Sequence, residues 1–153
     1  FLITGSLFDS KYKGSDGIER NTTFNAKYVL NVLGGKEFKL GKRGNILSLN
    51  IKASTIGGRY ATPINLAVSQ QAGIAVYDKQ YAFSEKQPAY FRVDFKISYR
   101  KEFRKSTLEA SLDLQNLTNH KNIFSQGYDP RANRLYYNYQ QGFFPVPMVR
   151  YTF

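Results

Sequence analysis

Three carboxylates on predicted strands are the residues best suited to acid–base chemistry: Asp94, Glu109 and Asp113. Two carboxyl groups at a fixed separation can act as general acid and general base if the pKa of one is raised. Cations share the same polar positions: Lys52, Arg92 and Lys96. Cross-strand ion pairs are the more common reason for such mixed charge, so we interpret the carboxylates as ion-pair partners and predict that the chain is not an enzyme.

Other chemistry-bearing residue types are scarce. The 153-residue chain has no Cys and one His, His120. This leaves no thiolate zinc site, no disulfide scaffold and no Cys or Ser–His nucleophile. We therefore expect no metal and no cofactor, and we expect His120 to be an ordinary loop residue. The glycosylation pattern occurs at Asn21 and Asn116, but so short a pattern is weak evidence.

Positive charge is concentrated in two short segments. The chain has 22 Lys and Arg against 11 Asp and Glu. The two segments contain the cations Lys36, Lys39, Lys42, Arg43, Arg100, Lys101, Arg104 and Lys105. Solvated hairpin turns are one interpretation, and contact with anionic lipid headgroups, worth about 1 kcal/mol per cation, is the other. The aromatic residues do not alternate with these cations as a base-stacking surface requires, so we predict no nucleic-acid partner.

The elements that must position these residues are β-strands, because apolar and polar residues alternate with a period of two. Six segments are predicted as strands: residues 1–8, 24–30, 45–54, 91–99, 108–114 and 149–153. No window of similar length has a 3.6-residue apolar stripe, and no apolar run approaches the roughly 18 residues of a spanning helix. We predict an all-β fold, an antiparallel up-and-down meander of about six strands that occupies residues 1–153 as one unit.

Shorter and longer predicted connections alternate along the chain. Residues 33–44 and 101–106 form the shorter ones, and residues 10–21, 57–89 and 117–144 form the long ones. An antiparallel meander with this order has tight turns at one end and long loops at the other. This is typical of an outer-membrane β-barrel with periplasmic turns and extracellular loops. Loops of this length are uncommon in compact soluble domains unless they serve a function.

The 12 Tyr and 12 Phe lie largely near predicted strand ends, as in the aromatic girdles of membrane barrels. The core of a β-sandwich would explain Phe91 and Phe95 equally well, and the absence of Trp counts mildly against a girdle.

Two C-terminal segments carry more specific motifs. In residues 111–122, SLDLQNLTNHKN, an amphipathic strand ends in an Asn-Leu-Thr-Asn turn, and the chain closes on MVRYTF, with Val149, Tyr151 and Phe153 at alternate positions. The first segment resembles the penultimate-strand signature of TonB-dependent outer-membrane receptors. The second resembles the β-signal that the barrel-assembly machinery reads. The TPIN segment at 62–65 and the strand at 90–100 are similar to the same family.

The resemblance implies that the chain supplies about the last six strands of a 22-strand barrel in the outer membrane of a Gram-negative bacterium. The chain opens at Phe1 inside a predicted strand, so we expect a fragment, with the plug domain and TonB box outside it. The implied function is energy-coupled uptake of a scarce nutrient such as a siderophore, cofactor, glycan or peptide. The implied partners are outer-membrane lipid, the barrel-assembly machinery, TonB through the plug domain, and the nutrient.

In this family the extracellular loops and the inner wall hold the ligand. Tyr and Arg suit oxygen-rich ligands because they stack and donate hydrogen bonds. The candidate ligand-binding residues are therefore Arg59, Tyr60, Tyr128, Arg131, Arg134, Tyr136, Tyr137 and Tyr139. The alternative is that these residues only pack the loops together. If they bind ligand, replacing Tyr136 or Tyr137 with Ala should abolish uptake and leave barrel assembly intact.

Two other classes of protein stay open. One is a free-standing soluble β-sandwich or small barrel that binds a ligand or a partner protein. The other is a non-transporting outer-membrane barrel with an enzymatic or structural role. A receptor needs detergent for its extraction, whereas a soluble β-protein does not. A receptor also has a plug domain encoded upstream, which a non-transporting barrel lacks.

Overall fold

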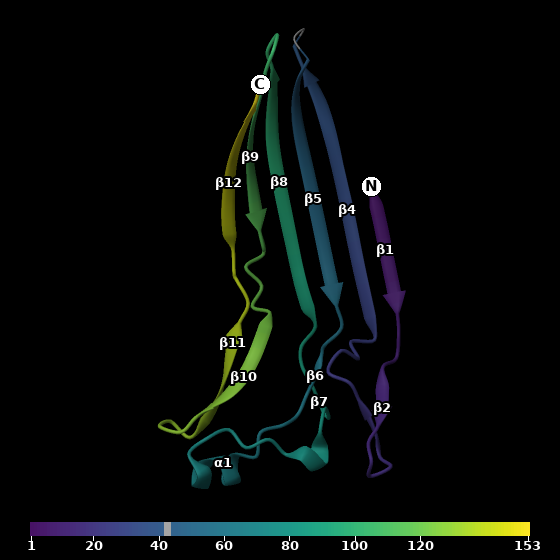
Figure 1. The fold of residues 1–153 in the computed structure, drawn as a ribbon, viewed down its shortest axis with the longest axis vertical. Coiled ribbons are helices and arrows are strands. Elements are labelled where there is room, and N and C mark those ends of the chain that lie inside the picture. The colour runs from purple at the N-terminus through teal and green to yellow at the C-terminus, as the bar shows by residue number, and fades with distance from the viewer. Residues whose placement is uncertain (42–43) are drawn as a thin grey trace.

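The computed structural model describes residues 1–41 and 44–153, and its main feature is one six-stranded antiparallel sheet (Figure 1). In spatial order the strands are β1 (Leu2–Leu7), β4 (Tyr28–Leu40), β5 (Asn45–Ile56), β8 (Tyr90–Glu102), β9 (Thr107–Gln115) and β12 (Phe144–Thr152). This order is also the order along the chain, so the predicted all-β fold and antiparallel meander are confirmed. The sheet is open, with β1 and β12 as its free edges.

The smaller elements lie in the three long connections, at the end of the sheet opposite the tight turns (Figure 1). The first connection forms the hairpin of β2 (Lys11–Lys13) and β3 (Glu19–Asn21). The second contains β6 (Tyr60–Ala61), α1 (Leu66–Ala72), the 3-10 helix η1 (Lys79–Tyr81) and β7 (Glu85–Lys86). The third forms the hairpin of β10 (Ile123–Asp129) and β11 (Arg134–Tyr139). Among the described residues, no helix has the length and apolar character needed to cross a membrane.

Both ends of β4 differ from the prediction. Residues 33–40 belong to β4, where Gly35 pairs with Asn50, so most of the predicted connection over 33–44 is strand. Lys42 and Arg43, which were predicted to lie in this turn, are outside the described residues. β4 starts only at Tyr28, because the preceding Lys27 has a φ of 71° that a strand cannot contain.

The last strand begins at Phe144, five positions before the predicted start at residue 149, and it includes Pro145 and Pro147. Its pairing with β9 is continuous through both prolines. In an antiparallel pair, every second residue of a strand hydrogen-bonds to its partner strand. Proline has no N–H, so the residues of β12 that bond to β9 must be the even-numbered ones. The backbone nitrogen atoms of both prolines then face the free edge of the sheet. Proline is tolerated there because the missing N–H has no partner strand in this sheet.

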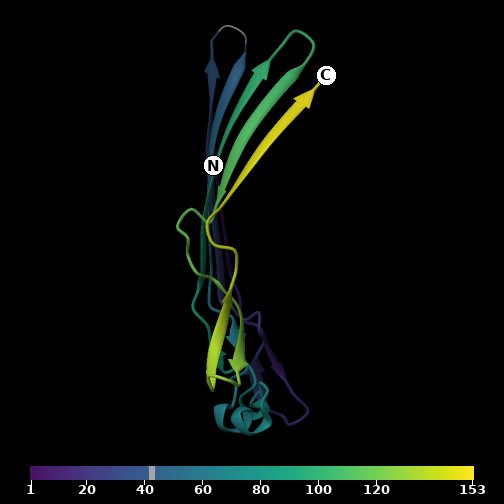
Figure 2. The same ribbon diagram turned by 90° about the vertical axis from the view of Figure 1, so that its left-hand side faces the viewer.

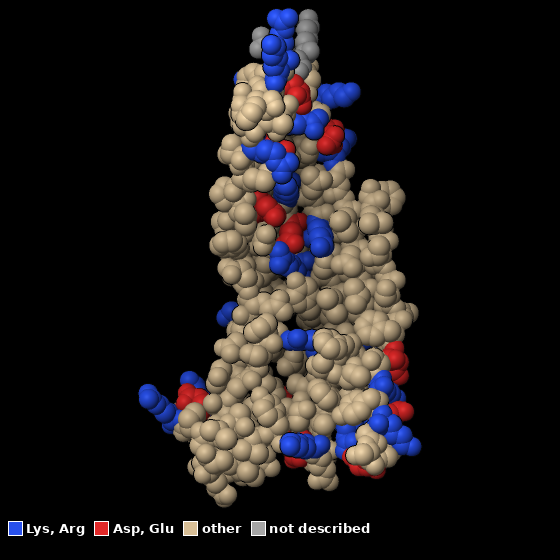
Figure 3. Space-filling view, viewed as in Figure 1, with Lys and Arg blue, Asp and Glu red and all other residues tan. Residues whose placement is uncertain are grey.

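The two faces of the sheet differ in polarity. On one face the register aligns Ile51, Phe95 and Leu114 across three strands, and on the other it aligns Asn50, Lys96 and Asp113. The upper half of the sheet is a single layer (Figure 2). The apolar side chains are exposed along the whole length of the apolar face, among them Leu30, Val32, Ile51, Phe91, Ile97, Tyr99 and Leu112. Charged side chains of both signs lie together along the middle of the sheet in the view of Figure 3.

Most buried side chains are polar and belong to the long connections. The buried apolar residues are Ala26, Ile64 and Tyr128, and the buried polar residues are Asn25, Ser69, Asn116 and Asn122. Each of these polar side chains is hydrogen-bonded to backbone groups. The long connections are therefore held in place mainly by side-chain hydrogen bonds, since there is almost no apolar core to hold them.

Candidate functional site

The long connections meet around a cavity of about 390 Å³, which we call the loop cavity. Its wall includes Thr23 of the first connection, much of the second connection and the start of β10. Two predicted ligand-binding residues, Arg59 and Tyr60, lie in this wall. The prediction did not include five others with suitable chemistry: Tyr77, Lys79, Phe83, Phe124 and Gln126.

Two buried glycines allow the connections to approach one another. A Cβ atom on Gly57 would overlap the carbonyl oxygen of Ala26, and one on Gly58 would overlap that of Gln87. The Arg59 carbonyl can therefore accept a hydrogen bond from the Gln87 amide at 2.8 Å. These close backbone contacts fix the chain directly after β5, and so they also fix the positions of the Arg59 and Tyr60 Cα atoms.

Arg59 links the second connection to the third. Its Nη2 atom donates to the carbonyl oxygens of Ile123 at 3.2 Å and Phe124 at 3.0 Å. Arg59 lies between the loop cavity and a second cavity of about 240 Å³ that also includes Asn122 in its wall. The Nε and Nη1 atoms of Arg59 have no hydrogen-bond partner among the described residues, so part of the guanidinium is available to a ligand.

Gln126 links the start of β10 to the second connection. Its Nε2 atom donates to the carbonyl oxygen of Thr62 at 3.2 Å. A carbonyl oxygen can only accept, so this bond fixes the orientation of the amide. The Oε1 atom is buried and has no hydrogen-bond partner within the described part of the chain.

The other predicted ligand-binding residues belong to the β10–β11 hairpin and do not line the loop cavity. Tyr128 is buried, and its hydroxyl donates to Asn133 Oδ1 at 2.7 Å, which makes it a packing residue. Arg131 lies in the turn and Arg134 begins β11, and both are exposed.

Three exposed tyrosines follow along β11. Tyr136 pairs with Gly127 and Tyr137 pairs with Gln126, so the two rings point to opposite faces of the hairpin. The ammonium group of Lys121 lies 5.8 Å from the centre of the Tyr139 ring. Of the eight candidates, the structure therefore brings only Arg59 and Tyr60 into one cavity.

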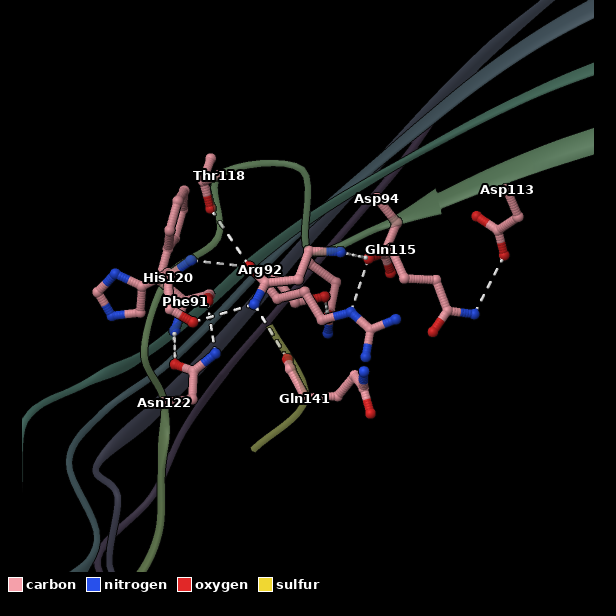
Figure 4. A network of polar contacts seen from close by, with 12 residues as sticks. Phe91, Arg92, Asp94, Asp113, Gln115, Thr118, His120, Asn122 and Gln141 are labelled. Atoms are coloured by element: carbon pink, nitrogen blue, oxygen red, sulfur yellow. Dashed lines mark hydrogen bonds and ion pairs between the residues drawn. The ribbon is translucent and has the colours of Figure 1, made fainter. Parts of the chain in front are cut away.

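The Asn-Leu-Thr-Asn turn ties the third connection to the sheet (Figure 4). The Asn116 side chain donates to the carbonyl oxygens of His120 at 3.0 Å and Gln141 at 3.1 Å, and it accepts from the His120 amide at 3.1 Å. Its backbone N–H donates to Asp94 at 2.9 Å. These contacts join both ends of the third connection to β8.

Asn122 completes the same network at the start of β8. Its side-chain amide accepts from the Phe91 N–H at 2.9 Å and donates to the Phe91 carbonyl oxygen at 2.8 Å. The Asn122 amide thus makes the two backbone hydrogen bonds that a neighbouring strand would otherwise make to Phe91. The segment that resembles a receptor signature therefore has a structural role in this chain.

The carboxylates do not form the predicted cross-strand ion pairs. Within the described part of the sheet, the ion pairs are Arg92 with Asp94 at 2.6 Å and Arg100 with Glu102 at 3.0 Å, each inside one strand. Residues two apart share a face, so the long arginine side chain reaches along its own strand. The described residues also contain no cluster of three or more potential metal ligands among His, Cys, Asp and Glu.

A buried amide and an ion pair hold the first connection together. Asn25 accepts from the Ser10 N–H at 2.9 Å and donates to Asp9 Oδ1 at 2.8 Å, and Lys27 pairs with the same carboxylate. The hydrogen bond from Lys27, followed by that from Asn25, holds the pKa of Asp9 below its ordinary value. The charged form of Asp9 therefore stabilises this connection.

Acidification should loosen the first connection. The pKa of Asp9 is lower in the folded chain than the value of about 3.9 that aspartate has in an unfolded chain. Ionised Asp9 therefore stabilises the fold fully above about pH 3.9, and this stabilisation is lost as the pH falls through the folded-state pKa. Hydrogen–deuterium exchange of residues 9–27, corrected for intrinsic rates, should be faster at about pH 3 than at about pH 5. Asp9→Asn should exchange faster at pH 5 and show a smaller change with pH, and an unchanged pH response would contradict this role of Asp9.

Comparison with protein-family models, with curated proteins and with solved structures finds no match to this chain.

Proposed function

We propose that the chain is part of the wall of a transmembrane β-barrel in the outer membrane of a Gram-negative bacterium, and that this barrel is a TonB-dependent receptor for a scarce nutrient. The observation that carries the proposal is a single-layered sheet with one exposed apolar face and one polar face. The six strands have between 6 and 13 residues each. At about 3.3 Å per residue and a spacing of about 4.8 Å between strands, they give an apolar face on the order of 1,000 Å². Soluble monomers rarely expose more than a few hundred Å².

The length of the central strands suits a bilayer. β4 and β8 each have 13 residues. At about 3.3 Å per residue each strand is roughly 43 Å long, and a tilt of about 45° reduces its span to roughly 30 Å. This is the thickness of the hydrocarbon core of a typical membrane.

Lysines and aromatic rings lie together at the tight-turn end of the apolar face. Lys36, which pairs with Leu49 on this face, lies 5.3 Å from the centre of the Phe38 ring. Lys101, which pairs with Leu108, lies 5.0 Å from the centre of the Phe103 ring. Long cationic side chains at this level can extend to lipid headgroups while their stems stay in the apolar layer. This favours the lipid-contact interpretation of the two basic segments.

The open edges favour a larger barrel. In hydrocarbon each unpaired backbone group costs several kcal/mol, so β1 and β12 both need further strands beside them. The assembly-signal residues Val149, Tyr151 and Phe153 are exposed at the end of β12, where a folding factor can reach them. The resemblance of residues 111–122 to the receptor signature adds the TonB-dependent function, with TonB contacted through a plug domain.

Fractionation of source cells tests the proposal. An antibody to the MVRYTF peptide should detect a band far larger than 17.5 kDa in detergent-extracted outer membranes, and the band should shift on boiling. A water-soluble band at 17.5 kDa would contradict the proposal and favour a soluble β-sandwich that covers its apolar face with a second sheet. A large membrane band whose gene encodes no plug domain would contradict only the receptor function.

A further inference from the structure

We propose that the loop cavity binds a small anionic ligand that carries hydroxyl groups on a ring, of the chemical class of the sugar acids. The inference rests on the proposed function, because the long loops are where a receptor would meet its nutrient. At about 390 Å³ the cavity is within the range of roughly 300–1,000 Å³ that is usual for ligand sites. Its wall comes from all three long connections, which Figure 1 shows together at one end of the sheet.

The charge of the cavity wall favours an anion. Arg59 and Lys79 are its charged residues, and no Asp or Glu lines it. Neither cation forms an ion pair with another described residue. Two cations without an opposing carboxylate attract a negatively charged group, and Arg59 can also donate directed hydrogen bonds to it.

Uncharged polar side chains in the wall suit hydroxyl groups on the same ligand. Tyr60, Tyr77 and Gln87 line the cavity. Phenol and amide groups can both donate hydrogen bonds to a ligand hydroxyl and accept them from it. The wall therefore suits a ligand that carries hydroxyl groups beside its anionic group.

Aromatic rings in the wall favour a ring-shaped ligand. Tyr60, Tyr77, Phe83 and Phe124 line the cavity, and Tyr77 and Phe124 are exposed. Flat rings stack well on the apolar face of a sugar-like ring, while hydroxyl groups at its edge meet the polar residues.

Phe83 is held in a strained conformation at this site. Its φ of 54° is rare for a bulky residue. The Phe83 amide donates to Thr62 Oγ1 at 3.2 Å, and the Phe83 ring makes an edge contact with Tyr12 at 6.1 Å between ring centres. Strain of this kind is concentrated at ligand sites, where the surrounding contacts keep a side chain in place.

Binding measurements on the intact protein extracted in detergent test the inference. The probes are digalacturonate, which is acidic and hydroxylated, digalactose, which is neutral, and succinate, which is acidic without hydroxyls. We expect digalacturonate to bind most tightly. Lys79→Gln should weaken its binding about tenfold and leave digalactose unchanged, because a charge-assisted contact is lost. Gln87→Leu removes an amide of the cavity wall, so it should weaken digalacturonate binding and leave succinate binding unchanged.

Matched controls keep the test specific. Lys13→Gln removes an exposed cation of β2 outside the cavity wall, and Gln71→Leu removes an exposed amide of α1. Both should bind digalacturonate as the unmodified protein does. Lys79 is exposed, so its variant should fold even if Gln87→Leu does not.

Two outcomes would overturn the inference: no preference for digalacturonate in the unmodified protein, or equal losses in the cavity variants and the controls. If the protein still fractionates with outer membranes, the receptor proposal stands and only the ligand class fails. If the protein is water-soluble, the receptor proposal fails whatever the cavity binds.

Discussion

If the chain forms part of the proposed membrane barrel, replacing Ile97 with arginine is expected to prevent its assembly in the outer membrane. Ile97 lies near the middle of β8 on the apolar face, and it pairs with Leu49 on one side and Leu112 on the other. In a membrane barrel this position faces lipid near the bilayer centre, where an arginine costs about 2–4 kcal/mol. The measurement is the fraction of protein in outer membranes that migrates as a folded, heat-modifiable band.

The neighbouring position provides the control. Ser98 lies in the same strand on the polar face, between Ser48 and Ser111. It borders a polar hollow of about 180 Å³ whose wall has two carboxylates, Glu37 and Glu109, and two cations, Lys96 and Arg100. An arginine there has space and polar neighbours, including carboxylates with which it can pair. Ser98→Arg should assemble normally. Normal assembly of Ile97→Arg, or equal loss in both variants, would contradict a lipid-facing apolar surface.

Replacing Asn116 with alanine is expected to lower the free energy of unfolding by about 3–5 kcal/mol, because each buried group left without a partner costs about 1–3 kcal/mol. Asn116 is 1% exposed, and its side chain pairs with two carbonyl oxygens and one N–H of the third connection. Its φ of 48° adds a smaller penalty for alanine, about 1 kcal/mol. Urea unfolding of the protein in detergent micelles measures the loss.

Two further variants separate the contributions. Asn116→Gly relieves the backbone strain but loses the same hydrogen bonds, so it should regain only about 1 kcal/mol. Asn119 also has a positive φ, 51°, but it is exposed and accepts one hydrogen bond, from the Phe143 N–H at 3.0 Å. Asn119→Ala should therefore cost much less. A loss as large as that of Asn116→Ala would show that burial of the Asn116 amide is not the cause.

Several elements of the long connections carried local signals that the strand periodicity did not reveal. Asn65 caps α1 by accepting from the Val68 N–H at 3.2 Å, and Gly73 ends the helix with a φ of 68°. Both residue types are typical of helix ends. With only seven residues, α1 is too short to show an apolar stripe. The β10–β11 hairpin was missed because β10 has no run of alternating apolar and polar residues: from Ser125 to Asp129 its one aromatic residue is Tyr128.

The loop cavity had no comparable local signal. Arg59 contacts Phe124, 65 positions away, and Gln126 contacts Thr62, 64 positions away. A preference for Tyr and Arg in loops identified Arg59 and Tyr60, but it also selected Tyr128, which is buried in packing. A single sequence does not show which loop residues meet, because side-chain contacts of this separation leave no periodic pattern.

The sequence is sufficient to predict the antiparallel sheet, the difference between its faces and the end at which its long loops lie. These features follow from a period of two within each strand and from the order of short and long connections. The folded chain was needed to show that Arg59, Lys79 and Gln126 line one cavity and that Tyr136 and Tyr137 point to opposite faces of their hairpin. Strand patterns repeat locally and can be read along the chain, whereas the loops are placed by a few hydrogen bonds between distant residues.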